Sequence, residues 1–238
     1  MSGYVAIVPA YNEQEAIASV VSDLNAMAER NGLQFDVIVV NDCSSDSTAS
    51  IIDGLKCIAL HLPVNLGIGG AMQTGFKYAF ENGYDFAFQV DGDGQHPADE
   101  LPKLIKAQQT NNWDVVIGSR FIDKTGFQSS TMRRTGINYF KYLNKALVGV
   151  EVTDSTSGFR MLNRKALEIV CDYYPDEYPE PEAIILYAKS KLQIGETSVE
   201  MRERQGGVSS IGTGASIYYM LKVTLGVVFT FIRIKQKK

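Results

Sequence analysis

Two carboxylates and a side-chain amide stand close together near the middle of the chain, in the segment Asp-Gly-Asp-Gly-Gln-His-Pro at positions 91–97. The apolar residues 86–90 precede them and predict a buried strand, so Asp91, Asp93 and Gln95 follow a strand end. Oxygen ligands of this kind hold Mg²⁺ or Mn²⁺ beside the phosphates of a substrate. The alternative is a solvated Asp-Gly turn. We favour the metal site, because ligands of α/β folds bind at the carboxyl ends of the strands.

Acidic and aromatic side chains follow two other predicted strands. Tyr11 and Glu13 come after the apolar residues 4–9, and Asp42 comes after the β-branched run 35–40. Carboxylates accept hydrogen bonds from a nucleobase or ribose, and Tyr11 offers a ring for stacking. The turn after residue 9 lacks the G-x-G-x-x-G sequence of dinucleotide-binding folds, which argues against a Rossmann-type dehydrogenase. Glu13 alone would also suit the first turn of a helix, where it complements the dipole.

Arginines at predicted element ends or in glycine-containing loops form a second group. The planar guanidinium fits phosphate oxygens well. A single arginine is more often part of a surface ion pair, whereas several at such positions suggest a second anionic ligand besides the one bound to metal. The group comprises Arg120, Arg133, Arg134, Arg160, Arg202 and Arg204.

The elements that must position these groups alternate along the chain. Alternating strands and helices predict an α/β fold with a parallel sheet and helices on both faces. After Ser119 the pattern is less regular and includes two polar loops, at 121–130 and 206–214. Strands are predicted at 4–9, 35–40, 57–62, 86–90, 115–118, 158–162 and 192–200, and helices at 16–27, 47–55, 69–81, 98–109, 133–148, 181–188 and 217–234.

Bulk properties describe a globular protein. The chain has 238 residues, 45% of them hydrophobic and 21% charged, which suffices for one large domain. A formal net charge of -4 provides no general attraction to nucleic acid. The three cysteines have no metal-like spacing, so we expect unpaired thiols in a reducing compartment. The first residues do not form a secretory signal, so the cytoplasm is the default location.

The segment 217–234 is the most apolar long stretch of the chain, and basic residues follow it. It is marginal in length for spanning a bilayer, and Lys222 interrupts it. We therefore expect an amphipathic, largely apolar helix in the plane of a membrane interface, with the terminal lysines on anionic head groups. The alternatives are a helix that packs on the core and a helix that docks on an integral-membrane partner.

Several segments together resemble the inverting glycosyltransferase family 2, which has the GT-A fold. The resemblance runs from Val5 to about Ile211 and is most like the dolichyl- or polyprenyl-phosphate sugar transferases. It implies a three-layer α/β/α sandwich with a mainly parallel sheet, which we expect over residues 1–211. The apolar segment described above then predicts a membrane-interface or partner-docking helix with a basic tail over 212–238. The matching segments are Val-Pro-Ala-Tyr-Asn-Glu (8–13), Val-Asn-Asp-Cys-Ser-Ser-Asp-Ser-Thr (40–48), Asn-Leu-Gly-Ile-Gly-Gly-Ala (65–71), Asp-Gly-Asp-Gly-Gln-His-Pro (91–97), Gly-Ser-Arg (118–120), Ser-Gly-Phe-Arg (157–160) and Arg-Gln-Gly-Gly-Val-Ser-Ser (204–210).

The resemblance also implies a role for individual residues. Asp91, Asp93 and Gln95 would bind the metal and the donor diphosphate, and Arg120 with Arg134 would meet the phosphate of the acceptor. The nucleobase and ribose of a sugar nucleotide would lie against Pro9, Tyr11, Glu13, Asp42 and Gly69, and the loop carrying Arg204 and Ser209 would close over the donor. The chain departs from the subfamily at Ser210, where a lysine is usual, and at Ile68 in the glycine-rich stretch.

The acceptor decides the chemistry. A lipid phosphate is already an anion at neutral pH, so catalysis would consist of positioning and of neutralising the leaving diphosphate. A sugar hydroxyl would need a carboxylate base, for which Glu180, Glu182 and Asp154 are candidates. For these three carboxylates, loop solvation or helix capping is an equally good interpretation.

The resulting prediction is a metal-dependent enzyme that moves a sugar from a nucleotide diphosphate to a polyprenyl phosphate. It would act at the inner face of the plasma membrane as a peripheral protein, with a small integral-membrane partner or a second copy as further partners. The first alternative is transfer to a lipid-linked saccharide in cell-surface polysaccharide assembly. The second is a non-catalytic nucleotide-sugar-binding subunit, against which the carboxylates and arginines argue.

Overall fold

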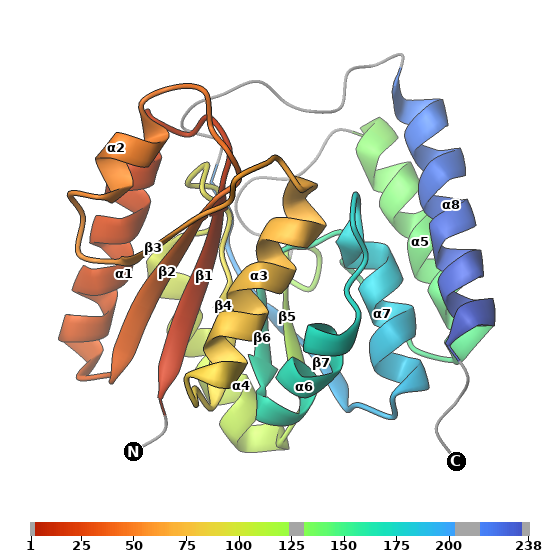
Figure 1. Cartoon of the computed structure of the whole chain (residues 1–238). Coiled ribbons are helices and arrows are strands. Elements are labelled where there is room, and N and C mark those ends of the chain that lie inside the picture. The colour runs from red at the N-terminus through yellow and green to blue at the C-terminus, as the bar shows by residue number, and fades with distance from the viewer. Residues whose placement is uncertain (1–2, 124–130, 203–214, 235–238) are drawn as a thin grey trace.

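A seven-stranded sheet forms the middle layer of the molecule in the computed structural model, which describes residues 3–123, 131–202 and 215–234, with the backbone alone at 131–133 and 215–217. The strand order is β3-β2-β1-β4-β6-β5-β7 (Figure 1). Only β6 runs antiparallel to its neighbours in this sheet, so the predicted mainly parallel sheet is confirmed. The strands are β1 (Tyr4–Ala10), β2 (Phe35–Asn41), β3 (Ile58–His61), β4 (Phe86–Gln89), β5 (Val115–Ser119), β6 (Arg160–Asn163) and β7 (Ile194–Ser198).

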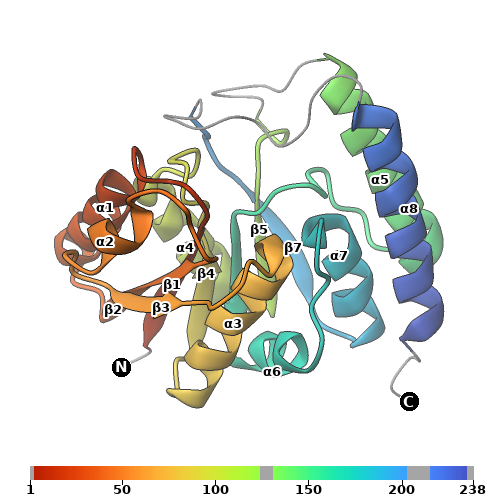
Figure 2. The same cartoon turned by 45° about the horizontal axis from the view of Figure 1, so that its top comes forward.

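Helices cover both faces of the sheet, which confirms the three-layer arrangement (Figures 1 and 2). The first face carries α1 (Ile17–Asn31), α2 (Thr48–Ile52), the 3-10 turn η1 (Ala98–Glu100) and α4 (Leu101–Asn111). The second face carries α3 (Gly67–Glu81), α6 (Arg164–Asp172) and α7 (Pro179–Lys189). Alternate residues of a strand point to opposite faces. Accordingly Ala6 and Val8 of β1 pack into one hydrophobic cluster, and Val5 and Ile7 pack into the other.

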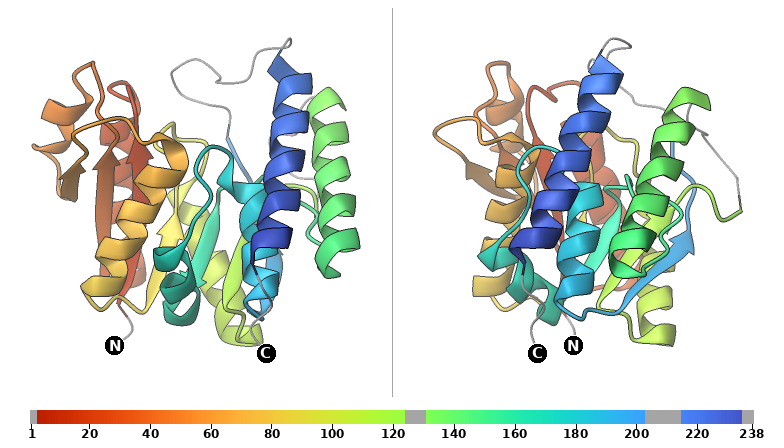
Figure 3. Two further views of the ribbon diagram at one scale, coloured as in Figure 1. Left: turned by 45° about the vertical axis from the view of Figure 1, so that its right-hand side comes forward. Right: turned by 90° about the vertical axis from the view of Figure 1, so that its right-hand side faces the viewer.

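An additional pair of helices lies outside α7, comprising α5 (Thr131–Val148) and α8 (Ala215–Arg233), as Figure 3 shows. A small core of Phe140, Ile185, Val223 and Val227 joins the three helices. Within the described ranges, no helix has the length and apolar character needed to cross a membrane.

Most predicted elements are confirmed, with differences at their ends. The helix predicted at 16–27 continues to Asn31, where Gly32 ends it in the left-handed conformation with φ 59°. Helix α6 was missed by the sequence analysis. Its N-cap Asn163, whose side chain accepts a hydrogen bond from the Ala166 amide, was a usable signal. Most of the loop predicted at 121–130 and all of the loop at 206–214 lie outside the described residues.

The parallel strands bring their carboxyl ends to one edge of the sheet. Ala10 pairs with Asn41 in register, and Ile7 pairs with Gln89. The segments that follow β1, β2 and β4 therefore emerge side by side, as the sequence predicted for Glu13, Asp42 and Asp91.

Candidate active site

The loop after β4 holds its two carboxylates in different environments. Asp93 is buried, and its Oδ1 accepts a hydrogen bond of 3.0 Å from the Gln95 amide. The Asp91 side chain is one-third exposed, and its Oδ2 lies 3.5 Å from Nε2 of the buried His96. His96 Nδ1 also accepts a 3.0 Å hydrogen bond from the Asp91 amide, so the ring secures the start of the loop. The sequence analysis did not assign this role to His96.

Two glycines allow the backbone to approach this loop closely. A Cβ at Gly92 would lie 2.8 Å from the carbonyl oxygen of Pro9. A Cβ at Gly158 would lie 3.2 Å from Oδ1 of Asp91 and 3.1 Å from Nε2 of Gln89. Gly158, which precedes β6, therefore leaves Asp91 accessible to a ligand because it has no side chain.

Polar side chains lie beneath the loop, between the sheet and α7. The fully buried Arg160 donates hydrogen bonds of 2.7 Å to the Ser157 carbonyl and 2.9 Å to the Glu180 carbonyl. Nε2 of Gln89 lies 3.5 Å from Glu180 Oε1, a long contact, and Tyr174 donates a 3.2 Å hydrogen bond to Gln89. Burial raises the pKa of Glu180, with the nearby Asp91 charge acting in the same direction and Arg160 opposing both. Glu180, a carboxyl group with a raised pKa, thus lies near Asp91, on the side of the loop that faces the sheet and α7.

Arg120, at the end of β5, forms a buried ion pair with Asp154. Its Nε and Nη2 donate to the two carboxylate oxygens at 2.7 Å each, and its backbone amide donates to Oδ2 at 3.2 Å. Asp154 has no exposed surface. Burial opposes ionisation, but the pair with Asp154 raises the pKa of Arg120. This geometry makes Asp154 the orienting partner of Arg120, and both of its oxygens already accept hydrogen bonds.

A further carboxylate fixes the position of Asp154. Glu196 of β7 accepts hydrogen bonds of 2.7 Å from the Thr153 amide and 3.0 Å from the Asp154 amide. Burial raises the pKa of Glu196, and these donors oppose that shift. Sequence reasoning missed Glu196, because its partners lie more than 40 positions away and no local motif marks it.

Arg134 of α5 approaches the same place as Arg120. The guanidinium carbons of Arg120 and Arg134 lie 5.4 Å and 5.9 Å from the ring centre of Phe121. A pocket of about 190 Å³ opens here, lined by Phe121, Arg134, Ile137, Asn138, Lys141 and Thr153. The two arginines that the sequence analysis assigned to one anionic ligand thus flank a single aromatic ring.

Residues predicted on the nucleotide side lie around the ends of β1 and β2. Tyr11 is half-exposed, whereas Asp42 is buried and accepts hydrogen bonds from the Leu66 and Gly67 amides at 2.7 Å and 2.9 Å. Asp42 therefore holds the start of α3 in place. Gly69 donates a 2.7 Å hydrogen bond to the Asp176 carbonyl. The Glu13 amide donates to the Thr48 hydroxyl at 2.9 Å, which ties the segment after β1 to α2.

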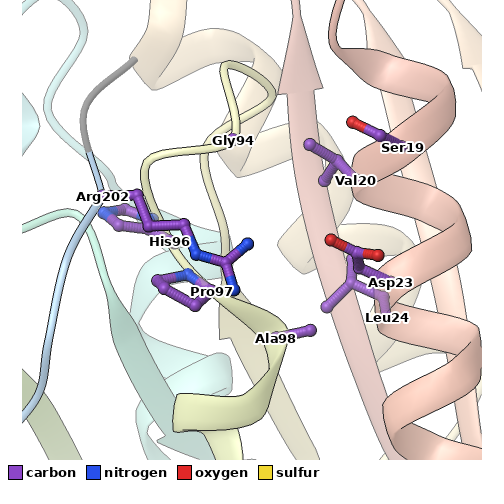
Figure 4. A pocket seen from close by; sticks show the side chains of 9 residues that line it. All are labelled: Ser19, Val20, Asp23, Leu24, Gly94, His96, Pro97, Ala98 and Arg202. Atoms are coloured by element: carbon purple, nitrogen blue, oxygen red, sulfur yellow. The ribbon is translucent and has the colours of Figure 1, made fainter. Parts of the chain in front are cut away.

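Not all predicted site residues converge. Glu182 lies between α7 and α8, where it accepts a 3.1 Å hydrogen bond from Thr230, so Glu180 is the carboxylate of this pair that lies near Asp91. Arg204 and Ser209 lie outside the described residues, as does the side chain of Arg133. The Arg202 amide donates a 3.0 Å hydrogen bond to the Gln95 carbonyl. Its side chain extends past His96 and Pro97 toward α1, beside a space of about 10 Å³ that has room for one water at most (Figure 4).

The donor set after β4 fits a hard divalent cation. Asp91 and Asp93 supply carboxylate oxygens, and Gln95 supplies an amide oxygen. The absence of a side chain at Gly158 leaves room on the Asp91 side. Over residues 3–123, 131–202 and 215–234, no group of three or more His, Cys, Asp or Glu side chains is arranged to hold a metal ion. A cation here would thus have at most two carboxylate ligands, and a substrate or water would complete its shell.

Comparisons with known proteins identify the family of the chain. The sequence model described as Glycosyl transferase family 2 matches residues 5–170. The chain is 31% identical to the UDP-N-acetylglucosamine–dolichyl-phosphate N-acetylglucosaminyltransferase of Methanococcus voltae over 90% of this chain and 93% of that protein. It is 31% identical to the undecaprenyl-phosphate mannosyltransferase of Micrococcus luteus, over 69% of this chain and 68% of that protein.

A solved structure confirms the fold. Glucosyl-3-phosphoglycerate synthase of Mycobacterium tuberculosis, in complex with Mn²⁺, UDP-glucose and phosphoglyceric acid, superposes with a TM-score of 0.73. The alignment covers 98% of this chain and 80% of that one at 16% sequence identity. At this identity the likeness establishes the GT-A architecture that the sequence predicted.

Proposed function

The chain belongs to glycosyl transferase family 2, and from this membership we propose that it transfers a sugar from a nucleotide diphosphate sugar to a polyprenyl phosphate. The relatives named for transfer to dolichyl phosphate and undecaprenyl phosphate support this acceptor class. The observation that carries the proposal is the convergence of Arg120 and Arg134 on Phe121, beside a pocket that also contains Lys141. Arg134 and Lys141 line this pocket and Arg120 lies at the same ring, while Asp154 and Glu151 pair with Arg120 and Lys141. The group keeps a net positive charge, which suits a phosphate monoester.

The nucleotide would bind at the carboxyl ends of β1, β2 and β4. Tyr11 offers an exposed ring to the base, and Glu13 offers a carboxylate to the ribose. Asp42 would act through the start of α3, because it accepts hydrogen bonds from the amides there.

Other residues would shape the nucleotide region without contacting the nucleotide through a side chain. At Gly69, only a residue without a side chain fits against the 175–176 backbone. Pro9 shapes the wall of this region through its contact with Gly92. Arg204 and Ser209 remain predicted contacts to the donor.

Asp91, Asp93 and Gln95 would hold a divalent cation, Mg²⁺ or Mn²⁺. When bound, such a cation stabilises the negative charge that develops on the leaving nucleoside diphosphate. Within the chain, the His96 ring accepts a hydrogen bond from the Asp91 backbone, and the backbone amide of Gln95 donates to the Asp93 carboxylate. The loop is thus ordered before a ligand binds.

Transfer would proceed with inversion in a single displacement. The phosphate oxygen of the acceptor forms a bond to the anomeric carbon as the bond from that carbon to the diphosphate breaks. The nucleophile is an anion at neutral pH, so no proton has to be removed. Arg120, oriented by Asp154, and Arg134 would hold the acceptor phosphate and align its oxygen. We place this reaction at the inner face of the plasma membrane.

One observation favours the second candidate, transfer to a sugar hydroxyl. Burial raises the pKa of Glu180, and the nearby Asp91 charge acts in the same direction; a raised carboxyl pKa suits a general base for a hydroxyl acceptor. Glu180→Gln separates the two reactions. A phosphate acceptor predicts at most a severalfold loss of kcat, whereas a hydroxyl acceptor predicts a loss of about 10²-fold or more. Glu182→Gln is the matched control, because the Glu182 side chain is directed at Thr230.

The test is a transfer assay with the full chain, Mn²⁺, a panel of labelled sugar nucleotides and undecaprenyl phosphate, followed by extraction of labelled glycolipid. We expect product with the wild-type protein and none with Asp93→Ala. Asp99→Ala, which removes a carboxylate from an exposed ion pair with Arg30, is expected to retain activity. Metal-dependent donor binding without product on any acceptor would instead indicate a non-catalytic binding subunit.

A further inference from the structure

Helix α8 exposes a continuous apolar stripe, formed by Tyr218, Leu221, Leu225, Phe229 and Ile232. Each of these side chains is at least 56% exposed. At about 100° of rotation per residue, they fall within an arc of roughly 80° on one side of the helix. The opposite side carries the buried residues Val223 and Val227, which pack against α5 and α7. The helix is thus fixed to the protein along one side and apolar along the other.

The exposed surface continues onto α5. Tyr139 and Tyr142 are 41% and 65% exposed, and the Tyr139 hydroxyl lies 3.1 Å from the Thr224 hydroxyl of α8. Figure 3 shows the two helices running along the same side of the molecule. The apolar stripe and these two tyrosines therefore form one surface, which we call the α5–α8 face.

Charge distinguishes between possible occupants of this face. Neither α5 nor α8 contains an aspartate or glutamate, whereas together they contain Arg133, Arg134, Lys141, Lys145, Lys222 and Arg233. Two acidic residues from outside the helices compensate part of this charge: Glu151 pairs with Lys141 and Lys145, and Glu177 pairs with Lys222. A second copy docked face to face would bring two basic surfaces together. An anionic surface would complement the face instead.

We propose that the α5–α8 face docks on a membrane surface that contains anionic lipids, with α8 in the plane of the interface. The apolar stripe enters the boundary between head groups and acyl chains, and its aromatic members suit that zone. Lys222 and Arg233 flank the stripe on one side, where Lys222 pairs with Glu177 and Arg233 lies over the Tyr173 ring. At this position their remaining hydrogen-bond donors would meet the head groups. The inference builds on the proposed function, since α5, which carries part of this face, also lines the pocket beside Arg134, and a lipid phosphate would reach that pocket from the membrane.

The test measures binding to vesicles without sugar donor or acceptor, so its outcome is independent of whether transfer occurs. The full chain is sedimented with sucrose-loaded vesicles of phosphatidylglycerol and phosphatidylethanolamine, or of phosphatidylcholine alone. We expect binding to the anionic vesicles that weakens with rising salt. The double substitution Leu225→Ser/Phe229→Ser should lower the partition coefficient at least tenfold.

Val64→Ser is the matched control, because Val64 is equally exposed, at 57%, and lies outside the α5–α8 face. Circular dichroism and the urea midpoint show whether the double variant is folded, and Tyr218→Ser/Leu221→Ser provides a second test of the stripe. Failure of the wild-type protein to bind vesicles overturns the proposal, as does binding that neither double variant weakens. Dimerisation in solution that the substitutions abolish, without vesicle binding, would show that a second copy occupies the face.

Discussion

The buried pair of Arg120 and Asp154 allows the stability of the site to be separated from its chemistry. Asp154→Ala removes a carboxylate with no exposed surface and leaves the 7% exposed Arg120 without two 2.7 Å hydrogen bonds. Removing one partner of a buried pair costs about 3–5 kcal/mol, because the remaining charge stays desolvated. For a chain of this size that loss corresponds to a fall in Tm of roughly 6–20 °C.

The double substitution Arg120→Met/Asp154→Ala removes both charges. It still deprives the Arg120 backbone amide of its 3.2 Å acceptor, which costs about 1–3 kcal/mol. Each single substitution should cost about 3–5 kcal/mol of unfolding free energy. The double substitution should cost less than the sum of the two, by a coupling energy of at least about 3 kcal/mol. Urea unfolding monitored by circular dichroism measures all four free energies of unfolding.

The transfer assay then provides the functional part of the test. If Arg120 holds the acceptor phosphate, the double variant regains much of its stability but not its activity. A coupling below about 1 kcal/mol, as for an exposed ion pair, would refute the energetic reasoning. Recovery of transfer in the double variant would refute the role of Arg120 at the acceptor. Lys165→Met, which removes a partly exposed cation paired with Asp114, is the control for loss of an ion pair elsewhere.

Two further substitutions test particular contacts. Burial raises the pKa of Glu182 above its ordinary value of 4.5, so its contribution to stability is present below pH 4.5 and is lost as the pH rises through the folded-state pKa. Glu182→Gln should therefore raise the urea midpoint at pH 7 and leave it unchanged at pH 4; an equal change at both values would contradict the assignment. Gly69→Ala would place a Cβ 2.0 Å from the Pro175 carbonyl oxygen and should cost about 1–3 kcal/mol in unfolding measurements. Gly54→Ala, whose Cβ meets only the Ile51 carbonyl at 3.5 Å, is its control, and an equal loss there would argue against a steric cause.

Local sequence patterns were sufficient for most of the architecture. Apolar runs of strand length, alternating with helical periodicity, predict a parallel sheet because each crossover requires a helix. They fail at α6, a nine-residue helix that directly follows a strand. They also misplace the end of α1, because the apolar periodicity stops at Met27 whereas the helix continues to Asn31, where the left-handed Gly32 ends it.

The candidate site divides in the same way. The carboxylate loop is encoded locally, because the apolar run before it suffices to predict that Asp91 and Asp93 follow a strand end. Their contact with a metal or donor stays a prediction. The proximity of Arg120 and Arg134 could be seen only in the tertiary structure, because the two arginines belong to different elements and approach each other at Phe121. The positioning role of Glu196 also required it, since β7 brings this carboxylate to the Thr153 and Asp154 amides.

The sequence by itself determined the α/β class, the carboxylates at the strand ends and the resemblance that led to the family. It did so because these properties depend on residues that are neighbours in the chain. Only the tertiary structure decided between Glu180 and Glu182. Side chains two positions apart on a helix point in nearly opposite directions. Because α7 packs between the sheet and α8, Glu180 lies near Asp91 and Glu182 faces Thr230 of α8. Packing likewise decided that one side of α8 is buried and the other is an exposed apolar stripe.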